Sequence, residues 1–197
     1  TRKGGCQGSG YCPRSMRRQK SKTFKVFAPT GPSYMDVEQG LLGNCYFHAA
    51  LAAVTFTHPE LIDAMFVRRH LWKVNIFTTK WLINGKESLI EVDQMVPGAQ
   101  RNRAYFAGAS DSNAWWVAIL EKAYAKIYDT YFMTYGGLTN DVLAGLTRAF
   151  VHRWNKDDHS KEELWTAMVW ATSRRHAMTG GFGSQLRAKY GLTGMHA

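Results

Sequence analysis

The sequence contains no run of about eighteen apolar residues, so it predicts no transmembrane segment. Cysteine is scarce: there are three, and Cys6 and Cys12 stand among glycines near the start of the chain. Two cysteines alone are too few for a structural zinc site. A disulfide between them is one interpretation, and two incidental thiols is the favoured one. The third, Cys45, stands by itself in an apolar segment.

Acidic residues are absent from the first 25 positions, which hold eight lysines and arginines. The chain carries a net charge of +10, but the rest of it holds 17 basic and 15 acidic residues. The basicity therefore belongs to an N-terminal arm, which could contact nucleic acid or an anionic membrane surface. The arm lacks interleaved aromatic residues and an amphipathic period, so a solvated linker is the favoured interpretation. We expect residues 1–22 to form a disordered arm.

Apolar residues are otherwise plentiful, at 45% of the chain, which predicts a folded domain with a substantial core. The sequence begins with Thr1 rather than methionine and ends without a polar tail. We therefore interpret it as a piece of a longer protein.

Hydrophobic periodicity predicts a mixture of helices and strands. Asn44 is expected to cap a buried helix over residues 46–56, and Pro59 to begin a short second helix. Asn84-Gly85 is a strong turn signal and predicts a β-hairpin. Its expected extended segments are 72–76, 81–83 and 89–97.

The second half of the chain predicts three more helices. Residues 115–131 are amphipathic, with Glu121, Lys122 and Lys126 expected on the polar face. A short helix is expected at 141–146. Ser160 and Glu163 have the capping-box spacing, which predicts a helix over 160–172.

Cys45 is a candidate nucleophile on local grounds. It directly follows Gly43-Asn44 at the expected start of a buried helix, where backbone N–H groups and the helix dipole favour a thiolate. Gln39 lies six residues upstream and could turn its amide toward the sulfur as an oxyanion donor. A lone cysteine in an apolar stretch is more often a core residue, so these observations leave both interpretations open.

Two longer motifs favour the nucleophile. The segment 36–47, Asp-Val-Glu-Gln-Gly-Leu-Leu-Gly-Asn-Cys-Tyr-Phe, resembles the nucleophile motif of calpain-type cysteine proteases. The segment 116–126, Trp-Val-Ala-Ile-Leu-Glu-Lys-Ala-Tyr-Ala-Lys, resembles a second calpain signature nearly letter for letter. Gly136-Gly137 and Leu146-Thr147 fall where calpains carry further glycine motifs. The ending Gly194-Met195-His196-Ala197 resembles the motif that bears the family's catalytic histidine.

The resemblance, which runs from about residue 23 to 197, implies roles for three residues. Cys45 is the expected nucleophile, His196 the general base and acid, and Gln39 the oxyanion donor. The family's orienting asparagine lies beyond the histidine, in an Asn-Pro-Trp-Gly segment that this sequence does not contain. We therefore expect the chain as given to be inactive by itself.

The resemblance also implies an α+β, papain-like fold with a helical first subdomain and a β-rich second one. We expect residues 23–149 to form the first subdomain, with Cys45, and 150–197 to begin the second, with His196. The implied activity is limited hydrolysis of protein substrates by an intracellular, cytoplasmic enzyme without an organic cofactor.

Several positions depart from the family pattern. Asn44 replaces an aspartate, Tyr46 a tryptophan and His48 a leucine. His48 lies one helical turn from Cys45, but the resemblance assigns the base to His196. Related calpains bind calcium in the first subdomain, where Asp36 matches one ligand, whereas Ala114 replaces the second. Asn113 or Asp111 could substitute, so calcium binding at Asp36 is a doubtful expectation.

Two alternatives to the protease remain. The departures around Cys45 would suit a catalytically inactive calpain homologue that binds or regulates proteins. The basic arm alone would suit a nucleic-acid-binding module.

Overall fold

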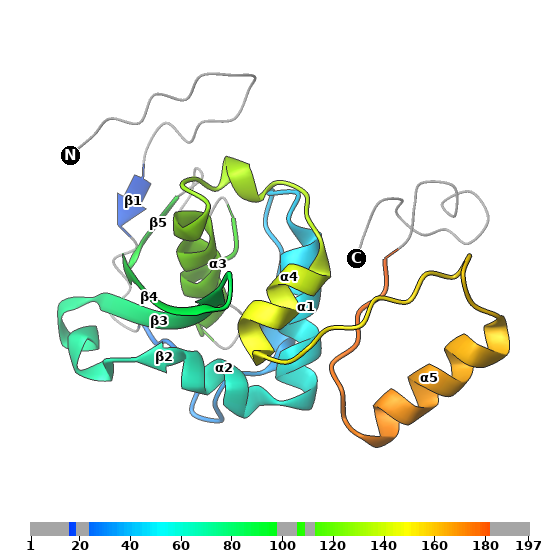
Figure 1. The fold of residues 1–197 in the computed structure, drawn as a ribbon. Coiled ribbons are helices and arrows are strands. Elements are labelled where there is room, and N and C mark those ends of the chain that lie inside the picture. The colour runs from blue at the N-terminus through cyan, green and yellow to red at the C-terminus, as the bar shows by residue number, and fades with distance from the viewer. Residues whose placement is uncertain (1–15, 19–23, 98–105, 109–112, 182–197) are drawn as a thin grey trace.

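The computed structural model describes residues 16–18, 24–97, 106–108 and 113–181 (Figure 1). The buried helix predicted after Asn44 is confirmed as α1, Cys45–Thr57, with Phe47, Leu51 and Val54 fully buried. The second predicted helix is α2, Pro59–Met65, and Pro59 is its first residue. A proline is favourable there because the first helical N–H has no partner within the helix.

The predicted hairpin is also confirmed. Strands β3, Ile76–Ile83, and β4, Lys86–Asp93, pair antiparallel in a register that runs from Ile76 opposite Asp93 to Ile83 opposite Lys86. Asn84 and Gly85 both have positive φ, at 49° and 74°, as a two-residue hairpin turn requires. A short strand β2, Phe66–Val67, pairs with the other edge of β3, so the sheet order is β2-β3-β4.

The predicted extension of the hairpin back to residue 72 is wrong. Residues Arg69–Val74 form the 3-10 helix η2, which is flanked by Arg68 and Asn75 in the left-handed conformation. The turn brings the Trp72 ring to 6.2 Å from the ring of Phe66, in an edge-to-face arrangement. Packing of this aromatic ring therefore overrides the alternating apolar pattern of residues 72–76.

Helix α3, Trp116–Ile127, lies against β3 and β4, and α4, Thr139–Thr147, packs against α1 and contacts β3 (Figure 1). Helix α3 ends about four residues before the predicted boundary, and the short helix expected at 141–146 is confirmed by α4. One hydrophobic core joins these elements. Its largest fully buried apolar side chains include Trp81, Trp116, Phe77, Phe47, Leu51, Ile62 and Leu120.

Part of the basic arm has regular structure. Strand β1, Met16–Arg18, pairs antiparallel with β5, Met95–Pro97. The expectation of an arm without secondary structure is therefore wrong at these three residues. The arm's other residues lie outside the described part of the chain.

Helix α5, Lys161–Ser173, has the predicted capping box: Ser160 Oγ accepts from the Glu163 N–H at 3.2 Å, and Glu163 accepts from the Ser160 N–H at 2.8 Å. No residue of α5 is buried, and the helix stands to one side of the core (Figure 1). The segment after it returns to α1, where Arg175 donates to the Thr57 carbonyl at 2.7 Å. The β-rich second subdomain and the domain boundaries stay predictions, because residues 182–197 are not described.

Gly40 provides a test of how closely the segments around α1 pack. A β-carbon at Gly40 would overlap the backbone of Phe106, whereas one at Gly180 would meet nothing within 4 Å. We expect Gly40→Ala to lower the free energy of unfolding by at least about 1–3 kcal/mol, because the backbone of Phe106 must move to make room for the new methyl group. The control Gly180→Ala should stay within about 0.5 kcal/mol of the wild type in chemical denaturation. Equal stabilities of the two variants would contradict the close approach.

Candidate active site

Cys45 is the first residue of α1 and is half-buried, as the nucleophile interpretation requires of a reactive thiol. Asn44 occupies the N-cap position, as predicted, but its side chain makes no capping hydrogen bond to the helix. The backbone N–H groups of Phe47 and His48 both bond to the Asn44 carbonyl, at 2.9 and 3.4 Å. The helix therefore begins regularly, with Cys45 beside its positive end.

The loop before Cys45 is closed by bonds to one carbonyl. Gln39 Nε2 donates to the Leu42 oxygen at 2.6 Å, and the Asn44 N–H donates to the same oxygen at 2.9 Å. The candidate oxyanion donor therefore lies in the loop that leads directly to the candidate nucleophile. The Leu42 carbonyl thus orients the Gln39 side-chain amide. One N–H of this NH₂ group makes the bond to Leu42, and the other N–H is not needed for it.

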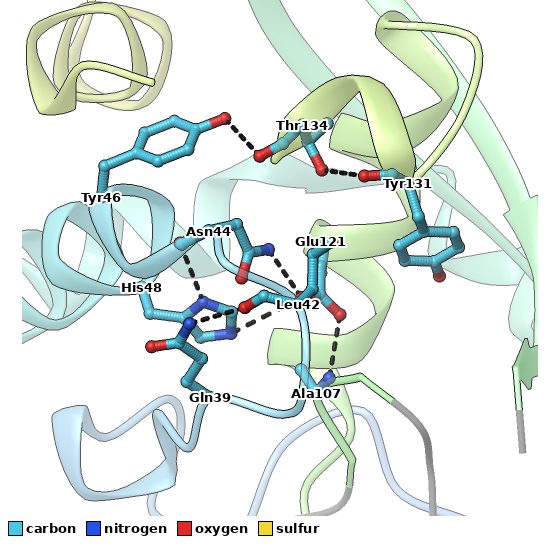
Figure 2. A network of polar contacts seen from close by, with 9 residues as sticks. All are labelled: Gln39, Leu42, Asn44, Tyr46, His48, Ala107, Glu121, Tyr131 and Thr134. Atoms are coloured by element: carbon cyan, nitrogen blue, oxygen red, sulfur yellow. Dashed lines mark hydrogen bonds and ion pairs between the residues drawn. The ribbon is translucent and has the colours of Figure 1, made fainter. Parts of the chain in front are cut away.

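The glycine pair singled out in the sequence lies beside this loop. The Gly136 N–H donates to the Gly43 carbonyl at 2.8 Å, and Gly137 packs against the Tyr46 ring. The Tyr46 hydroxyl donates to the Thr134 carbonyl at 3.0 Å (Figure 2). The glycines permit this close approach because a β-carbon on Gly137 would clash with the ring.

A buried carboxylate joins the start of α1 to two other segments. Glu121 projects from α3, and its Oε1 accepts from Asn44 Nδ2 at 2.7 Å while its Oε2 accepts from the Ala107 N–H at 2.9 Å (Figure 2). Glu121 is 2% exposed and Asn44 is fully buried. Burial raises the pKa of Glu121 to about 7, and the two hydrogen bonds act in the opposite direction.

The expected place of Glu121 on the polar face of its helix is wrong. Lys122 and Lys126 do reach the outer side, where they donate to the β4 carbonyls of Asp93 and Glu91 at 3.2 and 2.7 Å. Glu121 points inward instead, because Asn44 and Ala107 replace the water that its carboxylate would lose. The sequence held a signal: Glu121 lies four residues after Val117 and four before Ala125, both buried.

His48 lies next to this carboxylate, on the same helix as Cys45. Its side chain is buried, its Nδ1 stands 3.3 Å from the Asn44 carbonyl, and its Nε2 stands 3.8 Å from Glu121 Oε1 (Figure 2). Burial lowers the pKa of His48 to about 4, so the ring is neutral at neutral pH and forms no ion pair with Glu121. The neutral tautomer that fits this contact carries its proton on Nδ1, from which it donates a hydrogen bond to the Asn44 carbonyl.

Asp36 does not fit a calcium ligand. The side chain is buried, and its Oδ2 accepts from the Trp116 indole N–H at 2.8 Å and from the Ser33 N–H at 3.1 Å. Two N–H groups therefore direct their positive ends at Oδ2, and a cation at this oxygen would have to displace them. Ala114 contributes no side-chain oxygen, Asp111 is not described, and calcium needs about six to eight oxygen ligands. Asp36 instead caps the 3-10 helix η1, Tyr34–Asp36, through Ser33.

The other predicted residues lie outside the described part of the chain. His196, Cys6 and Cys12 belong to segments that are not described, so whether His196 meets Cys45 stays a prediction. Among the described residues, no group of three or more His, Cys, Asp or Glu could hold a metal ion. Within the same ranges, no helix is long and apolar enough to cross a membrane.

The buried pair His48 and Glu121 predicts two opposite pH effects on stability. Between pH 4.5 and about 7, folded Glu121 keeps a proton that the unfolded chain releases, so its contribution falls as pH rises. Between about pH 4 and 6.5, folded His48 lacks a proton that the unfolded chain binds, so its contribution rises with pH.

We therefore expect the stability of Glu121→Gln to rise relative to that of the wild type as the pH rises from 4.5 to 7. The stability of His48→Leu should fall relative to that of the wild type as the pH rises from 4 to 6.5. Each relative change should reach about 3 kcal/mol. Urea denaturation at several pH values measures both. Two variant curves that run parallel to the wild-type curve would contradict the burial of these groups.

The environment of Asp36 predicts weak calcium binding. Calorimetric titration of the protein with CaCl₂ should give no saturable heat with a dissociation constant of about 10⁻⁵ M or tighter, the range of calcium sensors. Magnesium serves as the control for non-specific cation binding. A tight, calcium-specific isotherm that Asp36→Asn abolishes would show that the carboxylate exchanges its N–H partners for the metal.

Comparison with known proteins identifies the family. A family model described as "Calpain family cysteine protease" matches residues 13–197. Calpain-5 of Caenorhabditis elegans is 32% identical over 146 residues, which cover 68% of this chain and 22% of that protein. Calpain-10 of Mus musculus is 30% identical over 138 residues, covering 68% of this chain and 20% of that protein.

A plant relative shows the same similarity over a shorter region. "Calpain-type cysteine protease ADL1" of Oryza sativa subsp. japonica is 36% identical over 112 residues, covering 57% of this chain and 5% of that protein. The chain thus spans at most about a fifth of the length of these relatives. Together with Cys45 at the start of a buried helix in a mixed α+β domain, the family match over most of the chain shows that this protein belongs to the calpain family of cysteine proteases.

Proposed function

We propose that the chain provides the catalytic core of a calpain-like cysteine endopeptidase that makes limited cuts in protein substrates. The observation that carries the proposal is the position of Cys45 at the first residue of a buried helix, directly after a closed loop. A thiol there is exposed enough to react and lies beside the helix end that favours its anion.

The proposed reaction has two steps. The Cys45 thiolate attacks the carbonyl carbon of the scissile peptide bond, and the amine leaves with the proton that His196 took from the thiol. Water, deprotonated by His196, then attacks the resulting thioester and releases the acid and the thiol. Gln39 is the proposed hydrogen-bond donor to the oxyanion. Its side-chain amide would reach the oxyanion by turning away from the Leu42 carbonyl.

The proposed architecture is papain-like. Residues 23–149 would form the helical first subdomain, and 150–197 would begin a β-rich second subdomain that carries His196 across a cleft. The orienting asparagine would come from a segment beyond His196. We propose an intracellular, cytoplasmic enzyme without an organic cofactor, in which Cys45, His196 and Gln39 carry the reaction.

A catalytically inactive homologue that binds proteins is the second candidate. The observation that favours it is the polar packing beneath Cys45, where Asn44 Oδ1 and His48 Nε2 are buried with no hydrogen-bond partner among the described residues. Buried polar groups without partners are costly and rarely kept without a reason. The reactivity of Cys45 separates the two candidates.

The proposed nucleophile predicts selective labelling. An epoxide or vinyl-sulfone probe of cysteine proteases should modify Cys45 faster than Cys6 and Cys12, because the helix start favours the thiolate. Peptide mapping by mass spectrometry gives the three rates in one sample. Cys45→Ala should lose the fast label and leave the two slow ones unchanged. Label on Cys6 or Cys12 with none on Cys45 would favour the inactive homologue.

A further inference from the structure

Asn44 breaks the usual rule for a helix cap. An asparagine at this position normally turns its side-chain oxygen to a backbone N–H of the first turn. Here the side chain turns away, its Nδ2 donates to Glu121, and its Oδ1 is buried with no partner among the described residues. Helix α1, which begins with Cys45, therefore receives no side-chain capping bond from Asn44, its N-cap residue.

Glu121 is the group that holds Asn44 in this position. Its Oε1 accepts from Asn44 Nδ2 at 2.7 Å, so the N–H₂ group of the Asn44 amide, and not the amide oxygen, faces the Glu121 carboxyl group. Its other oxygen is fixed by the Ala107 N–H at 2.9 Å. Ala107 follows Phe106, whose backbone lies against Gly40 at the other end of the nucleophile loop. One carboxylate thus ties both ends of the loop to α3.

We propose that Glu121 is a positioning residue for the Cys45 nucleophile: it keeps the Asn44 side chain from capping α1 and so leaves to the sulfur those first-turn N–H groups that, unlike the ones of Phe47 and His48, do not already bond to the Asn44 carbonyl. This inference deepens the proposed function and rests on it, because the N–H groups matter only where Cys45 reacts as a thiolate. Their partial positive charge stabilises an anion within the first turn. A capping oxygen from Asn44 would compete for the same donors.

His48 supports the arrangement from the other side. The neutral ring places Nε2 3.8 Å from Glu121 Oε1, too far for a hydrogen bond, and adds no charge that would draw the carboxylate from Asn44. No Lys or Arg of the described residues lies within salt-bridge distance of Glu121, and the charge of Glu121 contributes to raising the pKa of the buried Tyr131. Asn44 and Ala107 are therefore the partners that fix the carboxylate.

The test is the rate of Cys45 alkylation by iodoacetamide at pH 7, read by peptide mapping with Cys6 and Cys12 as internal references. Glu121→Gln should slow Cys45 by about three- to tenfold, because the new amide cannot accept from both Asn44 and Ala107 and releases Asn44 to cap the helix. Adding Asn44→Ala to that variant should recover most of the rate, because alanine has no capping oxygen. Glu162→Gln, on the exposed face of α5, is the matched control and should leave the rate unchanged.

A second pair of variants leaves Glu121 in place. Asn44→Ser puts a strong capping residue at the N-cap that is too short to reach Glu121, whereas Asn44→Ala cannot cap. Cys45 should react several-fold more slowly in Asn44→Ser than in Asn44→Ala. Far-UV circular dichroism confirms that each variant is folded before its rate is compared.

The outcomes separate this inference from the proposed function. If wild-type Cys45 reacts no faster than Cys6 and Cys12, the proposed function fails and the inference with it. If wild-type Cys45 is fast and Glu121→Gln matches it, only the inference is overturned. It is equally overturned if the double variant is as slow as Glu121→Gln or slower, because Glu121 would then have a structural role alone.

Discussion

The buried carboxylate of Glu121 is the interaction on which the candidate site depends. It bonds to Asn44 at the start of α1 and to Ala107 in a separate segment, and it belongs to α3, which lies against the sheet. Without it, Asn44 would be a buried amide without a partner for its N–H₂ group. The position of Cys45 is therefore set from α3, a helix that contributes no reacting group.

Two buried ionisable side chains, Glu121 and His48, lie beneath the candidate site without adding much charge to the core. Glu121 and His48 are both buried, and burial shifts their pKa values in opposite directions, to about 7 and about 4. Between those values, both groups are mostly neutral, so the interior holds little net charge in spite of two ionisable side chains. The buried His48 is accommodated because its ring stays unprotonated at neutral pH.

Much of the fold could be predicted from sequence because it follows from local signals. The apolar segment after Asn44, the Asn84-Gly85 turn, Pro59 and the Ser160 capping box each determine an element through its own residues. The site was only partly predictable. Motifs singled out Gly136-Gly137 and also Cys45 and Gln39, whose catalytic roles stay predictions. Glu121 was assigned to solvent because the helical period does not show which hydrogen-bond donors a distant segment supplies. Trp72 was misassigned because the alternating apolar pattern does not show that its ring packs edge-to-face on Phe66, six residues earlier in the chain.

The proposed function requires that Cys45 form the acyl-enzyme. Acid-quenched intact-mass analysis of the protein mixed with an activated peptide ester tests it most directly, with Cys45→Ala as the control. We expect one acyl group per chain, mapped to Cys45 and absent from the variant. Acylation at another residue, or equal acylation of Cys45→Ala, would contradict it.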